Sequence, residues 1–218
     1  MLDLLLPQRC LVCGRPRDTL CADCYAALPR LRGPLCARCG APTAWPVARC
    51  RECAGRRLAF ASARAAVAYD RGVSSVVLAW KERGLRRFVL LAAELVDEIV
   101  PRPRAYTVTF VPADGDRSSR RGHHPAHRLA AELGDRWQLP VRPLLERVGS
   151  ARPQRGLPLA DRRRNVAGAF RPVAGAPTSV ILVDDVYTSG ATVSVAASAL
   201  RKAGARRVHV VTFARAVR

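Results

Sequence analysis

Hydrophobic and polar positions follow two regimes along this chain. From about residue 60 onwards, short apolar runs alternate with segments in which apolar residues recur every three or four positions. The runs predict strands and the three-to-four spacing predicts amphipathic helices. Strands that alternate with helices are typical of an α/β domain whose sheet is mostly parallel. Before residue 60 neither period is present, so the first part of the chain needs another source of stability.

The elements of the α/β part follow from these patterns. Strands are predicted at 65–69, 107–111, 180–183 and 207–213, and helices at 73–83, 86–100 and after residue 192. The run 180–183 is apolar throughout, which is typical of a parallel strand buried on both faces. The stretch 147–169 is rich in Arg, Pro and Gly and lacks a period, so it predicts a long loop. Such loops are usually functional, and its arginines have the charge to close over a pyrophosphate; a solvated basic loop is the alternative.

All eight cysteines lie before residue 54, in four pairs with a two-residue gap. The pairs are Cys10 with Cys13, Cys21 with Cys24, Cys36 with Cys39, and Cys50 with Cys53. A two-residue gap lets both thiolates of a pair bind one tetrahedral ion, and two pairs complete a four-cysteine zinc site. The simplest prediction is two structural zinc ions held by consecutive pairs; an interleaved pairing stays open, and redox chemistry is the minor alternative. We expect this small zinc-ribbon module at residues 1–57 and the α/β domain at 58–218.

The charge of the chain favours a polyanionic partner. The formal net charge is +20, the sequence pI is about 11.3, and lysine occurs only at positions 81 and 202. An excess of cations over carboxylates suits nucleic acid, although phosphate-rich small ligands and a generally basic surface are alternatives. The early apolar run at 4–6 is too short for a signal peptide or a membrane span. We therefore expect a cytoplasmic protein with no membrane span.

The stretch 180–193, V-I-L-V-D-D-V-Y-T-S-G-A-T-V, carries the candidate chemistry. Asp184 and Asp185 follow the predicted strand, and ligands bind at the carboxyl ends of strands in open α/β sheets. The turn after them consists of Thr188, Ser189, Gly190, Ala191 and Thr192. Its hydroxyls, its glycine and the free N–H groups of a helix start suit a phosphate, and carboxylates nearby suit ribose hydroxyls, directly or through Mg²⁺. The alternative is a strand with an acidic end before an N-capped helix.

This stretch closely resembles the 5-phosphoribosyl-1-pyrophosphate (PRPP) binding motif of type I phosphoribosyltransferases. The apolar run, the Asp-Asp pair and T-S-G-A-T stand in the same order. The resemblance implies that Asp184 and Asp185 face the ribose hydroxyls and serve catalysis in an enzyme, and that 188–192 binds the 5-phosphate. The same motif also serves regulators that bind PRPP or nucleotides without catalysis.

With the cysteine pairs in front of this motif, the whole chain is similar to the ComF family, in which a double zinc ribbon precedes a phosphoribosyltransferase domain. Tyr69, Lys81 and Gly84 match the family, as does Arg121 with Gly122. The resemblance implies a PRPP site that includes Lys81 and Arg121, and Mg²⁺ bound with PRPP. It also implies a role in competence, the uptake of external DNA, with single-stranded DNA and a competence helicase as partners.

Three functions remain open on the sequence. The favoured one is a PRPP-binding, phosphoribosyltransferase-like protein that serves DNA uptake. The second is an active Mg²⁺-dependent phosphoribosyltransferase of nucleobase salvage, in which the aspartates and the loop arginines act by electrostatic positioning. The third is a non-catalytic DNA-binding adaptor that contacts the nucleic-acid backbone. Where family members usually carry V-P-V-P-L, this chain has V-P-A-D-G at 111–115, which adds a carboxylate to the pyrophosphate region.

Overall fold

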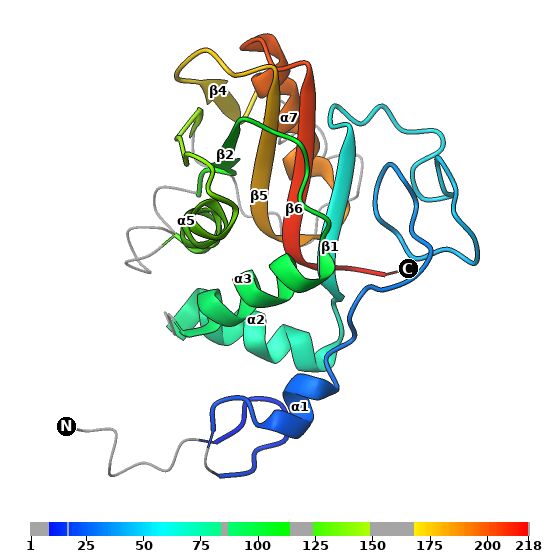
Figure 1. Cartoon of the computed structure of the whole chain (residues 1–218), viewed down its shortest axis with the longest axis vertical. Coiled ribbons are helices and arrows are strands. Elements are labelled where there is room, and N and C mark those ends of the chain that lie inside the picture. Colours follow the sequence, from blue (N-terminus) through cyan, green and yellow to red (C-terminus); the bar gives the residue numbers. More distant parts are fainter. Residues whose placement is uncertain (1–8, 17, 84–86, 114–123, 149–167, 218) are drawn as a thin grey trace, which may run out of the picture.

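The computed structural model describes residues 9–16, 18–83, 87–113, 124–148 and 168–217. Its centre is a four-stranded sheet in the order β1-β6-β5-β2 (Figure 1). The strands are β1 (Ser62–Ala68), β6 (Arg207–Arg215), β5 (Ser179–Tyr187) and β2 (Thr107–Phe110). All three neighbouring pairs are parallel. The predicted α/β class with a mostly parallel sheet is therefore confirmed.

Alternate residues of β5 face two separate hydrophobic cores. Ile181 and Val183 face the core formed with α2 (Arg71–Arg83), α3 (Arg87–Ile99) and α5 (Pro125–Trp137). Val180 and Leu182 face the core formed with α7 (Ala191–Lys202). None of these four side chains has any exposed surface, so the prediction of a strand buried on both faces is confirmed.

Several element boundaries differ from the predicted ones. β1 begins three residues before the expected start at 65, because its pairing with β6 already starts at Ser62, opposite His209. β5 does not end at residue 183 but continues to Tyr187, since β6 pairs with it along its whole length. The hairpin of β3 (Leu145–Arg147) and β4 (Phe170–Pro172) was missed, because each strand is only three residues long. Most of the predicted loop, 149–167, lies outside the described residues.

The two cysteine segments pack on different sides of the sheet. The first ribbon, which we define as residues 10–24, continues into the short helix α1 (Ala22–Ala26). Leu11 and Leu20 of the ribbon and Tyr25 of α1 pack on the core of α2 and α3. The second ribbon, residues 36–53, belongs to the core that includes α7. Figure 1 shows the first in dark blue below α2 and the second in light blue beside β1. The assignment of both ribbons to one module with a boundary at 57 stays a prediction.

The linker between the ribbons lies along the free edge of β1. Arg30 pairs with Val67 in an antiparallel bridge, and the Leu31 amide donates to the Ala66 carbonyl at 2.8 Å. The chain therefore passes from one side of the sheet to the other along this edge. Within the described ranges, no helix has both the length and the apolar composition to cross a membrane.

The free end of β5 positions the candidate site. The last residue of β2, Phe110, pairs with Val183, and the Val111 amide still donates to the Val183 carbonyl at 2.9 Å. β5 continues for four residues beyond this point, paired there with β6 alone. The carboxyl end of β5, which carries Asp184 and Asp185, thus has an edge that β2 leaves uncovered.

Candidate functional site

The two aspartates lie inside β5 and meet a lysine from α2. The Lys81 ammonium lies 2.7 Å from Oδ2 of Asp185, with 26% of the lysine side chain and 15% of the aspartate side chain exposed. Asp184 Oδ1 accepts a hydrogen bond from the Asp185 amide at 2.9 Å. The structure therefore brings together Lys81 and both aspartates, three of the residues predicted for the site.

The group formed by Lys81, Asp184 and Asp185 has an excess of negative charge, because one ammonium faces two carboxylates. Burial, and then the neighbouring Asp185 carboxylate, raises the pKa of Asp184 to about 7, although Lys81, the Asp185 amide and Arg147 act in the opposite direction. Burial alone would lower the pKa of Lys81, but attraction to Asp185 and Asp184 more than offsets it and the pKa is raised. Hydroxyl donors or a hard divalent cation would relieve this excess of negative charge.

The turn between β5 and α7 is shaped by Gly190. This residue has φ +72° and directly precedes the first residue of α7. A β-carbon at Gly190 would lie 2.3 Å from the hydroxyl oxygen of Tyr187, so a side chain there would require Tyr187 to shift. The first N–H groups of a helix have no partner within the helix, and those of α7 follow Thr188, Ser189 and Gly190. The predicted phosphate turn 188–192 therefore leads into a helix start, and its assignment as a phosphate site stays a prediction.

Arg121 lies outside the described part of the chain, as does Asp114. Their assignment to the site stays a prediction. Arg147, at the end of β3, was not among the predicted site residues, but its charge acts on Asp184.

The eight cysteines form two four-thiol clusters of consecutive pairs. One cluster holds Cys10, Cys13, Cys21 and Cys24, and the other holds Cys36, Cys39, Cys50 and Cys53. The sulfurs of Cys36 and Cys53 lie 3.6 Å apart and those of Cys39 and Cys50 lie 3.4 Å apart. Four thiolates at about 2.3 Å from a tetrahedral zinc ion are separated by about 3.8 Å. Both clusters thus suit structural zinc, and the structure has the sequential arrangement of the pairs.

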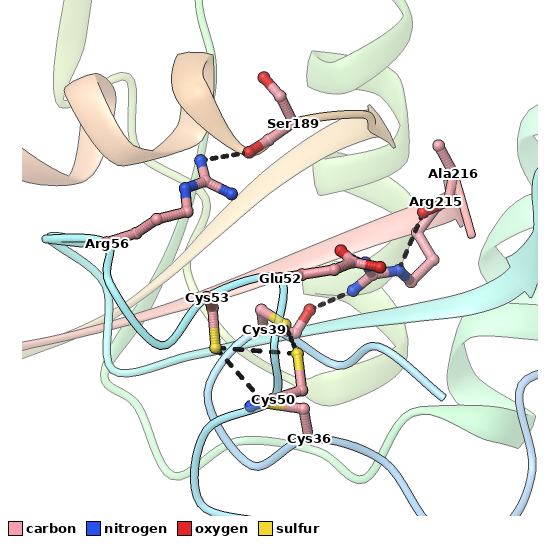
Figure 2. Close-up of polar contacts among 9 residues, drawn as sticks. All are labelled: Cys36, Cys39, Cys50, Glu52, Cys53, Arg56, Ser189, Arg215 and Ala216. Atoms are coloured by element: carbon pink, nitrogen blue, oxygen red, sulfur yellow. Dashed lines mark hydrogen bonds and ion pairs between the residues drawn. The ribbon is translucent and has the colours of Figure 1, made fainter. Parts of the chain in front are cut away.

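The segment that directly follows the second ribbon contacts the predicted phosphate turn, and Arg215 contacts the ribbon itself, as Figure 2 shows. Arg56 donates through Nη2 to the Ser189 carbonyl at 2.5 Å. Arg215, at the end of β6, donates to the Cys39 carbonyl and, at 2.9 Å, to Oε2 of Glu52. Sequence patterns did not identify Arg56, Glu52 or Arg215, because their partners are far away in the chain. The only available signal was a carboxylate, Glu52, between two cysteines of an otherwise basic segment.

A comparison with protein-family models matches the first part of the chain, and a search of solved structures gives weaker similarity. The sequence model of the Double zinc ribbon domain matches residues 1–54. A crystal structure of a purine phosphoribosyltransferase from Pyrococcus horikoshii Ot3 is 23% identical and covers 59% of this chain and 71% of that one, with a TM-score of 0.30.

Two relatives match nearly end to end. Competence protein F of Haemophilus influenzae is 26% identical over 212 residues, which cover 92% of each chain. The DNA utilization protein YhgH of Salmonella typhimurium is 30% identical over 225 residues, which cover 95% of this chain and 96% of the relative. Together with the double zinc ribbon and the parallel α/β sheet, this similarity shows that the chain belongs to the ComF family.

Proposed function

We propose that this protein binds PRPP with Mg²⁺ at the carboxyl end of β5 and serves the use of external DNA in the cytoplasm. The observation that carries the proposal is the arrangement of Lys81, Asp185 and Asp184 immediately before the phosphate turn. A ligand with vicinal hydroxyls at one end and a phosphate at the other matches the order of these groups along the chain. The eight free thiols suit a reducing compartment.

Each part of the site has a role in this proposal. Asp184 and Asp185 accept hydrogen bonds from the ribose hydroxyls, while the turn 188–192 donates its backbone N–H groups to the 5-phosphate. Mg²⁺, when bound, neutralises the pyrophosphate. Lys81 holds the carboxylate of Asp185 in place, and Arg121 is assigned to the site by family resemblance. In a transferase these groups would act by positioning and electrostatic stabilisation.

Calorimetric titration with PRPP and Mg²⁺ tests the site. Asp185→Asn should weaken PRPP binding about tenfold or more, a loss of about 1.4 kcal/mol. Asp135→Asn, which changes an exposed carboxylate on α5, is the matched control and should bind PRPP normally. Unchanged affinity in Asp185→Asn would disprove the assignment. Pyrophosphate release measured across the nucleobases separates a transferase from a binding protein.

A second role, contact with single-stranded DNA, is supported by a basic cleft at the opposite end of the sheet. The cleft has a volume of about 770 Å³ and lies where β5 and β6 begin. Its lining includes Arg102, Arg104, Arg206 and Arg207, and the side chain of Tyr106 there is 68% exposed. None of these four arginines forms an ion pair with a carboxylate of the described residues. Arginines track a phosphate backbone and an exposed aromatic ring stacks on a base.

The names of the relatives refer to competence and to DNA utilization, which agrees with this second role. Fluorescence anisotropy with a labelled single strand should show affinity that falls steeply as salt rises, and Arg206→Gln with Arg207→Gln should reduce the salt slope by about two. No binding even at low salt would exclude the role. A competence helicase is the protein partner that family resemblance implies, and co-purification of the two proteins tests it.

A further inference from the structure

The two ribbons of this chain make different contacts, and among the described residues only the second is followed by a segment that contacts the phosphate turn and the start of α7. We propose that zinc binding by Cys36, Cys39, Cys50 and Cys53 holds the phosphate turn in its binding conformation, whereas zinc at the first ribbon does not. Arg215 and Arg56 are the positioning residues of this connection. The inference rests on the proposed function in that it takes the turn to be the phosphate site.

The first connection is a buried arginine at the end of β6. Only 1% of Arg215 is exposed, and its guanidinium has two partners in the second ribbon, the Cys39 carbonyl and Glu52 (Figure 2). Arginine stays charged in proteins, so loss of these partners would leave an uncompensated buried cation. Since the knuckles of a zinc ribbon take their shape from the metal, zinc determines where the Cys39 carbonyl and Glu52 lie.

Arg215 is connected in turn to Tyr187 and through it to the turn. Its guanidinium carbon lies 5.0 Å from the centre of the Tyr187 ring, within the range of a cation–π interaction. The edge of Phe60 contacts the same ring, with centroids 6.3 Å apart. Gly190 lies directly on Tyr187, with no space for even a β-carbon between them. A shift of Tyr187 toward the turn would therefore displace Gly190, the residue whose positive φ shapes the turn.

A second connection leads from the segment after Cys53. Arg56 donates to the Ser189 carbonyl and so holds the peptide that precedes Gly190. The Ala59 amide donates to the Ser194 hydroxyl at 3.2 Å, in the first turn of α7. The phosphate turn and the first turn of α7 are thus both attached to the segment that follows the second ribbon.

The second ribbon is itself tightly seated on the sheet. Gly40, next to Cys39, approaches β1 so closely that a β-carbon would lie 2.4 Å from the Ala63 carbonyl oxygen. The Ala63 amide also donates to the Arg38 carbonyl at 2.9 Å. These backbone contacts fix the cysteine knuckle against β1. The knuckle therefore cannot move without a change in its contacts with the sheet.

The first ribbon provides an internal comparison. Its neighbourhood contacts α3, where Tyr25 donates to Glu94 at 3.3 Å and Arg32 pairs with Glu98. Val12 lies beside Gly72 at the start of α2. None of the described contacts of residues 10–24 reaches 187–194, although the two ribbons share the same ligand set.

The experiment compares Cys50→Ser with Cys24→Ser in the full-length, zinc-loaded protein. The wild type should hold two zinc ions and each variant about one. Hydrogen–deuterium exchange of a peptide covering 188–194 is the first measurement, because it needs no ligand. Cys50→Ser should speed exchange in this peptide at least tenfold and weaken PRPP binding at least tenfold. Cys24→Ser should change both less than twofold and instead speed exchange in α3.

Two further variants retain all eight cysteines, in case Cys50→Ser fails to fold. Arg56→Ala and Glu52→Gln should keep two zinc ions and yet speed exchange at 188–194 severalfold. Unchanged exchange in these two variants, or equal effects of Cys50→Ser and Cys24→Ser on the turn, would overturn the inference. If the wild type binds no PRPP but the exchange difference is present, the proposed function fails and the connection between ribbon and turn stands.

Discussion

Replacing Asp184 with Asn should stabilise the protein more at pH 8 than at pH 5. In the folded protein, burial and the adjacent Asp185 raise the pKa of Asp184 from the ordinary value of 3.8 to about 7. Between these two values the folded protein binds a proton that the unfolded chain releases. Stability therefore falls as pH rises from about 4 to about 7, and it no longer depends on this group above that range. Asparagine has a similar shape but cannot ionise, so the variant escapes this loss.

The size of the effect follows from the two pKa values. One pKa unit corresponds to about 1.36 kcal/mol, and a group with these values costs the folded state about 2.6 kcal/mol between pH 5 and pH 8. Asp184 is only partly buried, so solvent screens part of this cost, and we expect a difference of about 1 to 2.5 kcal/mol. The gain from Asp184→Asn should have this size at pH 8 relative to pH 5.

Urea unfolding of both proteins at the two pH values, without Mg²⁺, measures the effect. Comparing variant with wild type at each pH removes the contribution of titrating groups that do not interact with Asp184. Asp135→Asn is the control, because it removes an exposed carboxylate and should give the same difference at both pH values. A gain in stability from Asp184→Asn that is equal at pH 5 and pH 8 would show that ionisation of Asp184 does not destabilise the folded protein. Such a result would refute the reasoning.

Three further changes test neighbouring parts of the site. Lys81→Met should destabilise the protein by about 1 to 3 kcal/mol at pH 8 in urea unfolding, since it leaves two carboxylates without their cation. Gly190→Ala should lower the free energy of unfolding by about 1 to 3 kcal/mol in the same assay and weaken PRPP binding, because Gly190 has a positive φ and contacts Tyr187. Unchanged stability together with unchanged PRPP affinity would contradict the packing. Tyr187→Phe should be neutral or stabilising by up to about 1 kcal/mol, because the buried hydroxyl has no hydrogen-bond partner among the described residues; a large loss of thermal stability would reveal a partner.

The features that the sequence predicted correctly depend only on residues that are close together along the chain. Two cysteines two residues apart can share one ion whatever the rest of the chain does, and an apolar run such as 180–183 must be buried somewhere. The order of strand, aspartates and phosphate turn is likewise a local property. For this reason the α/β class and the zinc clusters could be expected before the fold was known, whereas the assignment of the candidate site stays a prediction.

The features that only the tertiary structure decided depend on contacts between distant segments. Leu28 and Trp45 both belong to the cysteine region and both were available for packing, yet Leu28 is buried and Trp45 is 69% exposed. β5 extends to Tyr187 because β6 lies beside it, which no pattern within 180–187 indicates. The ion pair of Lys81 with Asp185 requires α2 to end at the carboxyl edge of the sheet. Arg215 joins the second ribbon to Tyr187 only because the sheet order places β6 between β1 and β5, and sheet order is a property of the whole chain.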